Sequence, residues 1–228
     1  MGLEIIYEDD ELIAINKPHG LLVHRSRIAS DATEFAVQLL RDQIGGTHVY
    51  PVHRLDRKTS GVLLFAKTRK DNQRLQLMFR NRIVAKTYEA FVRGYTEPNG
   101  TIDYALETNG KTQEAKTVYE TINKFELPVV STGYKTSRYS LVKLMPETGR
   151  FHQLRKHMAH IRHPIIGDRP HGCNKQNKLW KYRFGMATML LHACSLSLHF
   201  SESNTLQISA TKHQVFENVL SYCEKYKR

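Results

Sequence analysis

HRLDRKTSGVLLFAK, residues 53–67, is the stretch from which the fold and chemistry of this chain can be predicted. Asp56 stands between two arginines, Arg54 and Arg57, and shortly before a Thr-Ser-Gly turn. The apolar run 62–66 that follows has the length of a buried strand. A loop anchored by a buried strand is a common place for chemistry, and neighbouring cations keep a carboxylate ionised. An ordinary ion pair on a surface loop gives the same pattern, so a structural carboxylate is the alternative.

The same stretch closely resembles the signature of the RluA-type pseudouridine synthases, a family whose motif aspartate is catalytic. The resemblance implies that Asp56 is the catalytic residue here. It also implies the pseudouridine synthase fold, which is α+β with a mixed, mainly antiparallel β-sheet, flanking helices and a central active-site cleft. The segment Asn16-Lys17-Pro18-His19-Gly20 resembles the opening of the same family.

Residues 85–92 alternate as a strand, which places Lys86 and Tyr88 on one face. A tyrosine on a strand is usually a core or edge residue. However, Lys86-Thr87-Tyr88 resembles the family's Lys-x-Tyr motif, whose tyrosine lies against the target base. Since bases stack on aromatic rings, the resemblance implies a catalytic role for Tyr88.

Residues 148–157, TGRFHQLRKH, resemble a third motif of the family. Its last arginine pairs with the catalytic aspartate, which implies that Arg155 holds Asp56. A guanidinium fork fixes both oxygens of a carboxylate in direction as well as charge. An ordinary core helix with a basic surface is the alternative. Its apolar stripe consists of Phe151, Leu154, Met158 and Ile161.

Other polar residues of the three motifs are candidate RNA-binding residues. They are His53, Arg54, Lys86, Arg150, His152 and Gln153. Four histidines between 152 and 163 also raise the question of a metal site, but the sequence has no Cys-x-x-Cys or His-Glu-x-x-His motif. We expect no metal and no cofactor, because the implied reaction exchanges bonds within one substrate.

The charge of the chain favours a polyanionic partner. Its 228 residues include 34 Lys and Arg against 22 Asp and Glu, a net charge of +12. A membrane surface is the alternative, but no apolar stretch approaches the roughly 20 residues that span a bilayer. The three cysteines are far apart, which fits a reduced compartment, and the N-terminus lacks the basic segment of a signal peptide. We therefore expect a cytoplasmic, monomeric, RNA-binding protein.

We expect one catalytic domain over 1–228, with no separate N-terminal RNA-binding domain. Helices are expected around 33–44, 69–82, 150–162 and 211–227. Asp31-x-x-Glu34 has the form of a capping box that opens the first of them.

Residues 163–168, HPIIGD, again resemble the family, and the continuation 171–177, HGCNKQN, resembles the branch that modifies uridine 65 of tRNA. Nine Lys or Arg against one Asp between Arg150 and Arg183 form a positive segment that suits phosphates. A synthase acting on large-subunit rRNA fits the family motifs equally well. A non-catalytic RNA-binding module is the alternative from another class. It would be favoured if Asp56, Tyr88 or Arg155 were missing.

The reaction implied by the resemblance converts uridine to pseudouridine. A glycosidic C–N bond breaks, the uracil turns, and a C–C bond forms. The uridine must first leave its helix, at a cost of roughly a few kcal/mol, and Arg54 is a candidate to fill the vacated space. Asp56 then acts either as a nucleophile or as a base on the ribose through a glycal. The sequence leaves both routes open.

Overall fold

The computed structural model describes residues 2–24, 33–130 and 133–228, which form two compact units. The first comprises Met1–Lys86 and Ala193–Lys212, and the second comprises Thr87–His192 and His213–Arg228. Strands β5 (Val84–Arg93) and β11 (Leu191–His199) each pass from one unit into the other. Asp31 lies outside the described residues, but the expected capping box does not open the first helix: that helix starts at Ala36, and the residue before it is the extended Phe35, without a side-chain cap.

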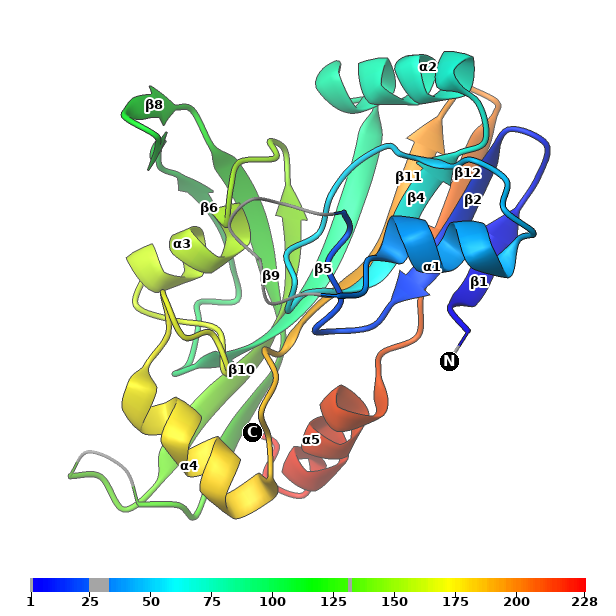
Figure 1. Cartoon of the computed structure of the whole chain (residues 1–228). Helices are drawn as coiled ribbons and strands as arrows, with labels where there is room; N and C mark the ends of the chain where they lie inside the picture. The colour runs from blue at the N-terminus through cyan, green and yellow to red at the C-terminus, as the bar shows by residue number, and fades with distance from the viewer. Residues whose placement is uncertain (1, 25–32, 131–132) are drawn as a thin grey trace. The chain divides into compact units, whose positions relative to one another are not determined.

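The first unit combines antiparallel strands with two helices (Figure 1). The strands are β1 (Glu4–Glu8), β2 (Leu12–Lys17), β3 (Tyr50–Pro51), β4 (Ser60–Ala66), most of β11, and β12 (Thr205–Ser209). The helices are α1 (Ala36–Gln43) and α2 (Arg69–Arg80). Antiparallel pairs join β1 to β2, β2 to β4, β3 to β4, and β12 to β11.

Strand β4 is the centre of the first unit, as its apolar run predicts. All seven of its residues are buried. Val62 and Leu64 belong to a core cluster that also contains Leu75 of α2. Helix α2 begins after Thr68, whose Oγ1 accepts a hydrogen bond from the backbone N–H of Asp71 at 3.1 Å. The loop before β4 is therefore anchored on a rigid strand.

The second unit also consists of antiparallel strands and helices. Its strands are most of β5, β6 (Asn99–Asp103), β7 (Leu106–Thr108), β8 (Lys111–Gln113), β9 (Lys116–Leu127) and β10 (Ser137–Pro146). Its helices are α3 (Gln153–His160), α4 (Asn174–Phe184) and α5 (Gln214–Glu224). Antiparallel pairs join β5 to β10, β10 to β9, β9 to β6, and β7 to β8.

Alternate residues of β5 divide the core of the second unit into two clusters. Ala90 and Val92 belong to the cluster that contains Leu154 of α3. Phe91 points the other way, into a cluster with Trp180 of α4 and residues of α5. Helices therefore cover both faces of these strands. The expected α+β class, with a mainly antiparallel sheet and flanking helices, is confirmed, while the central cleft stays a prediction.

Two expectations about helices need correction. Helix α3 begins at Gln153, not near 150, because His152 adopts a left-handed conformation with φ 56°, which no residue of a right-handed helix has. Phe151, expected on the apolar stripe, is 46% exposed. Helix α4 was not anticipated, because lysines and amides outnumber apolar residues along 174–184.

Candidate active site

Asp56 lies half-buried on the loop that enters β4. The backbone N–H of Thr59 donates to the carbonyl oxygen of Asp56 at 3.1 Å, which closes a turn. Arg57 and Gly20 bind each other reciprocally: Arg57 Nε donates to the Gly20 carbonyl at 3.0 Å, and the Gly20 N–H donates to the Arg57 carbonyl at 2.7 Å. The loop of Asp56 is thus fastened to the loop after β2.

Lys17 is a fully buried cation that connects the same two loops. Its Nζ donates to the carbonyl oxygens of Pro18 at 2.8 Å, Leu21 at 2.9 Å and Arg57 at 3.3 Å. Burial lowers the pKa of Lys17 to about 7, while attraction to the Asp56 carboxylate acts in the opposite direction. Lys17 therefore braces the loop and, when protonated, places a positive charge near Asp56.

Gly61 allows β4 to approach β11 closely. Its φ is +109°, and a Cβ atom at this position would lie 2.1 Å from the carbonyl oxygen of Ala193. Since any other residue would collide with this backbone, the Thr-Ser-Gly turn after Asp56 requires glycine. The glycine in the signature is explained by packing.

His53 has a structural contact within the first unit. Its Nε2 accepts a hydrogen bond from the backbone N–H of Leu64 at 3.1 Å, and its ring stacks on Phe79 with 5.0 Å between centroids. Burial, followed by repulsion from Lys86, lowers the pKa of His53 to about 4. The ring is therefore neutral at physiological pH, so it offers no positive charge to phosphates. A contact of the neutral ring with RNA stays a prediction.

Arg54 and Lys86, two further RNA-binding candidates, also belong to the first unit. Arg54 is exposed. Lys86 is half-buried, and its burial, followed by repulsion from Arg82, lowers the pKa of Lys86 to about 8. Arg54 is thus the candidate with the more accessible charge.

Arg155 forms a buried, bidentate ion pair with Asp168 in the second unit. Its Nε and Nη2 donate to the two carboxylate oxygens, each at 2.8 Å. The two side chains are 8% and 1% exposed. Removing either partner would leave a buried charge, at a cost of roughly 3–5 kcal/mol. The predicted pairing of Arg155 with Asp56 joins residues of different units and stays a prediction.

Asn177 of α4 fixes the loop that carries Asp168. Its Oδ1 accepts from the backbone N–H of Gly167 at 2.8 Å, and its Nδ2 donates to the backbone carbonyl of Asp168 at 2.7 Å. At Gly172, a Cβ atom would lie 1.8 Å from that same carbonyl oxygen, so glycine is required there. A chain of contacts therefore runs from α4 through Asp168 to Arg155.

Gln153, predicted to bind RNA, is buried and hydrogen-bonded within the protein. Its Oε1 accepts from Thr148 Oγ1 at 2.7 Å and from the Arg150 N–H at 3.0 Å, and its Nε2 donates to the Lys116 carbonyl at 3.0 Å. Arg150 Nε donates to the Glu114 carbonyl at 3.0 Å. These bonds hold the segment before α3 in place, which is a structural role.

His152 lies half-buried at the start of α3. Its ring stacks on Phe151, with 3.7 Å between centroids, and its Nδ1 lies 3.0 Å from Nε2 of His171. The backbone N–H of His171 lies 3.4 Å from Asp168 Oδ1. The histidine pair therefore adjoins the Arg155–Asp168 ion pair.

Tyr88 lies on β5, half-buried at the margin of the cluster that contains Leu154 and Met158 of α3. On the neighbouring strand β10, Leu144 is its register partner. A tyrosine combines an aromatic face with a polar hydroxyl, which suits contact with a base. Its contact with a uracil base stays a prediction.

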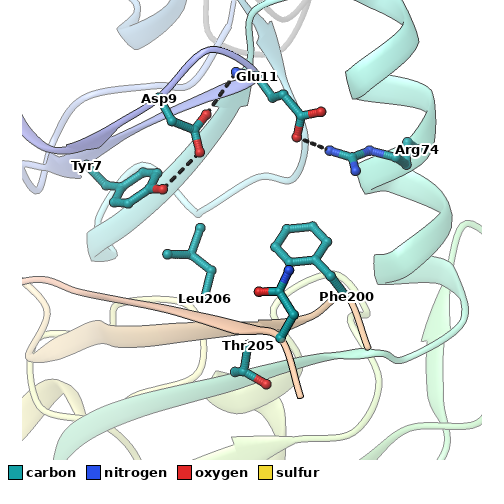
Figure 2. Close-up of a pocket in the computed structure, with 8 residues that line it drawn as sticks. Tyr7, Asp9, Glu11, Arg74, Phe200, Thr205 and Leu206 are labelled. Carbon is teal, nitrogen blue, oxygen red and sulfur yellow. Dashed lines mark hydrogen bonds and ion pairs between the residues drawn. The ribbon is translucent and has the colours of Figure 1, made fainter. Parts of the chain in front are cut away.

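A surface pocket of about 380 Å³ opens in the first unit, away from the predicted site residues (Figure 2). Tyr7 Oη donates to Asp9 at 2.9 Å, Arg74 forms an ion pair with Glu11, and its guanidinium lies 5.5 Å from the ring centroid of Phe200. These polar groups satisfy one another and join the β1–β2 turn to α2. The pocket therefore has a structural explanation.

Among residues 2–24, 33–130 and 133–228, no group of three or more His, Cys, Asp or Glu is arranged to hold a metal ion. In the same part of the chain, no helix has the length and apolar character needed to cross a membrane.

The family described as RNA pseudouridylate synthase matches residues 11–160, a range that includes Asp56, Tyr88 and Arg155. The chain belongs to this family. It is 44% identical over 232 residues to the tRNA pseudouridine synthase C of Vibrio cholerae, covering 96% of this chain and 95% of that protein.

Two further comparisons agree. The chain is 49% identical over 205 residues to the tRNA pseudouridine synthase C of Pasteurella multocida, covering 85% of this chain and 84% of that protein. The solved structure of human RNA pseudouridylate synthase domain containing 4 is similar with a TM-score of 0.75 and 26% identity, covering 97% of this chain and 93% of that one.

Proposed function

We propose that this chain converts a uridine of tRNA to pseudouridine, with Asp56 as the catalytic residue. One observation carries the proposal: a half-buried carboxylate lies on a loop pinned by the buried Lys17, inside the segment that matches the family. Relatives named tRNA pseudouridine synthase C support tRNA as the substrate. Uridine 65 is inferred from the resemblance carried by residues 171–177.

The proposed chemistry begins with an ionised Asp56. Lys17 holds the loop of this carboxylate in place, because its Nζ donates to the Arg57 carbonyl at 3.3 Å. In one route the carboxylate attacks the substrate as a nucleophile, and in the other it removes a proton from the ribose. Either way the C–N bond breaks and the same two fragments rejoin through carbon, so nothing is oxidised or reduced.

Two residues of the second unit complete the proposed site. Tyr88 lies against the flipped uracil, since the faces of bases stack on aromatic rings. Arg155 orients Asp56. The bidentate contact with Asp168 already fixes the direction in which the Arg155 guanidinium points. A guanidinium carries five N–H groups, more than one carboxylate accepts at once. We expect the Arg155 guanidinium to donate hydrogen bonds to the carboxylates of both Asp168 and Asp56.

The candidate RNA contacts differ in how well their environments suit the role. Arg54 is exposed and charged, so we propose it for the displaced backbone or the space left by the uridine. Three further motif residues are half-buried, and we also propose them as RNA contacts: Lys86, Arg150 and His152. Gln153 contributes to RNA binding only indirectly, because its hydrogen bonds hold the segment before α3 in place.

The test uses purified protein, tRNA transcripts and a large-subunit rRNA fragment, with pseudouridine mapped by nucleotide. We expect the wild type to modify tRNA and Asp56→Asn to form no product. The affinity of Asp56→Asn for tRNA should stay within about a few-fold of the wild type, because phosphate contacts dominate binding.

The matched control is Asp42→Asn, which removes the same charge from an exposed position on α1 of the same unit. It should keep full activity. Turnover by Asp56→Asn would refute the catalytic assignment, and modification of the rRNA fragment alone would refute the substrate.

A further inference from the structure

Helix α4 carries a row of exposed cations outside the three family motifs. Lys175, Lys178 and Lys181 follow one another at intervals of three residues, and all three are exposed. Tyr182, four residues after Lys178, is 82% exposed. Residues three or four apart lie on one side of a helix, so these four side chains form a continuous face, here called the α4 face.

The opposite side of α4 fixes the direction of this face. Trp180 is fully buried and meets Tyr139 edge-on, with 5.3 Å between ring centroids. Tyr139 Oη donates to Gln176 Oε1 at 2.5 Å. Together with the two hydrogen bonds of Asn177, these contacts prevent rotation of the helix. In Figure 1, α4 is the yellow helix of the second unit.

The positively charged side chains of α4 do not stabilise the helix, so stability does not explain their presence. Residues 174–184 include four cations and no acidic residue. Lys175 lies in the first turn, where the helix dipole disfavours a cation, and like charges three residues apart repel each other. Within the part of the chain that the structure describes, none of the three lysines has an ion-pair partner. A bound polyanion would relieve this repulsion.

We propose that the α4 face binds the phosphodiester backbone of the substrate RNA, a proposal that rests on the function proposed above. The lysines neutralise phosphates, and Tyr182 contacts the sugar–phosphate chain, as tyrosines commonly do in nucleic-acid interfaces. Asn177 of the same helix fixes the loop of Asp168, which grips Arg155. RNA held on α4 is therefore held by the element that positions Arg155.

The decisive variant is Lys175→Gln/Lys178→Gln/Lys181→Gln, tested with full-length tRNA over a range of salt concentrations. We expect the dissociation constant to rise at least about tenfold near physiological salt. The slope of log Kd against log salt should fall by up to about 2.7, because each phosphate that a lysine no longer neutralises lowers it by about 0.9. The turnover number at saturating tRNA should stay at the wild-type value, and Tyr182→Ala should weaken binding without changing the slope.

The control triple is Lys70→Gln/Arg80→Gln/Lys111→Gln, which removes the same charge from exposed positions on other elements. An unchanged Kd in the α4 triple, or an equally large rise in Kd in both triples, would overturn the proposal. So would unchanged RNA affinity together with weakened binding to anionic lipid vesicles. If the wild type forms no pseudouridine, the proposed activity fails, while the affinity comparison still decides whether the α4 face binds RNA.

Discussion

At the scale of single residues, Lys17 is the group whose environment is furthest from that of a free side chain. Its pKa is lowered to about 7 by burial, whereas an unfolded chain holds the proton up to a pKa near 10.4. Between these values the unfolded state binds one more proton than the folded state. Stability contributed by this residue therefore increases as the pH rises above about 7.

The prediction compares wild type with Lys17→Met in denaturant unfolding between pH 6 and pH 9. The free energy of unfolding of the wild type, relative to the variant, should rise by up to about 1.4 kcal/mol per pH unit above pH 7. The exposed Lys70→Met serves as the control and should show no such slope. If the difference in free energy of unfolding between wild type and Lys17→Met stays constant from pH 6 to pH 9, the pKa of Lys17 is not lowered by burial.

The sequence predicts the chemistry of individual residues better than their partners. Asp56, Tyr88 and Arg155 each lie in a motif that resembles one of the family's. Asp168, which holds Arg155, and the carbonyl oxygens that hold Lys17 are not indicated. The partner of a side chain depends on which segments pack beside it, and spacing along the chain does not determine this.

At the scale of elements, Asn177 gives the clearest test, because it binds two backbone groups of the loop before α4. Asn177→Ala leaves both groups without their partner, and we expect a loss of about 1–3 kcal/mol of stability. Turnover should fall while the affinity for tRNA is kept, because Asp168 would lose its fixed position beside Arg155.

Asn174→Ala is the matched control, since Asn174 is exposed at the start of the same helix. It should unfold at the wild-type concentration of urea and keep its turnover number. Equal behaviour of the two variants would contradict the role given to Asn177.

Elements with a strong apolar pattern agree with the sequence. Strand β4 and helix α2 lie where the apolar run and the helical spacing predict them. Helix α4 was not predicted, because a single buried tryptophan, a buried glutamine and contacts from distant strands stabilise it. Helix α3 starts late because hydrogen bonds of Thr148 and Gln153 hold the preceding turn outside the helix.

At the scale of the whole molecule, the excess of positive charge and the family motifs agree on RNA. The net charge of +12 includes the three lysines of the α4 face, which have no acidic neighbour on their helix. The motif residues are distributed over both units, with Asp56 and Lys17 in the first and Tyr88 and Arg155 in the second. The proposed site residues therefore come from both units.

The catalytic role of Asp56 in tRNA modification is tested by a map of pseudouridine in total tRNA and rRNA from a strain that lacks this gene. We expect the deletion to remove pseudouridine from one tRNA position, proposed as 65. The wild-type gene should restore it, and the Asp56→Asn gene should not. A deletion strain that keeps pseudouridine at every tRNA position, or a return of the lost pseudouridine with the Asp56→Asn gene, would contradict the proposed activity.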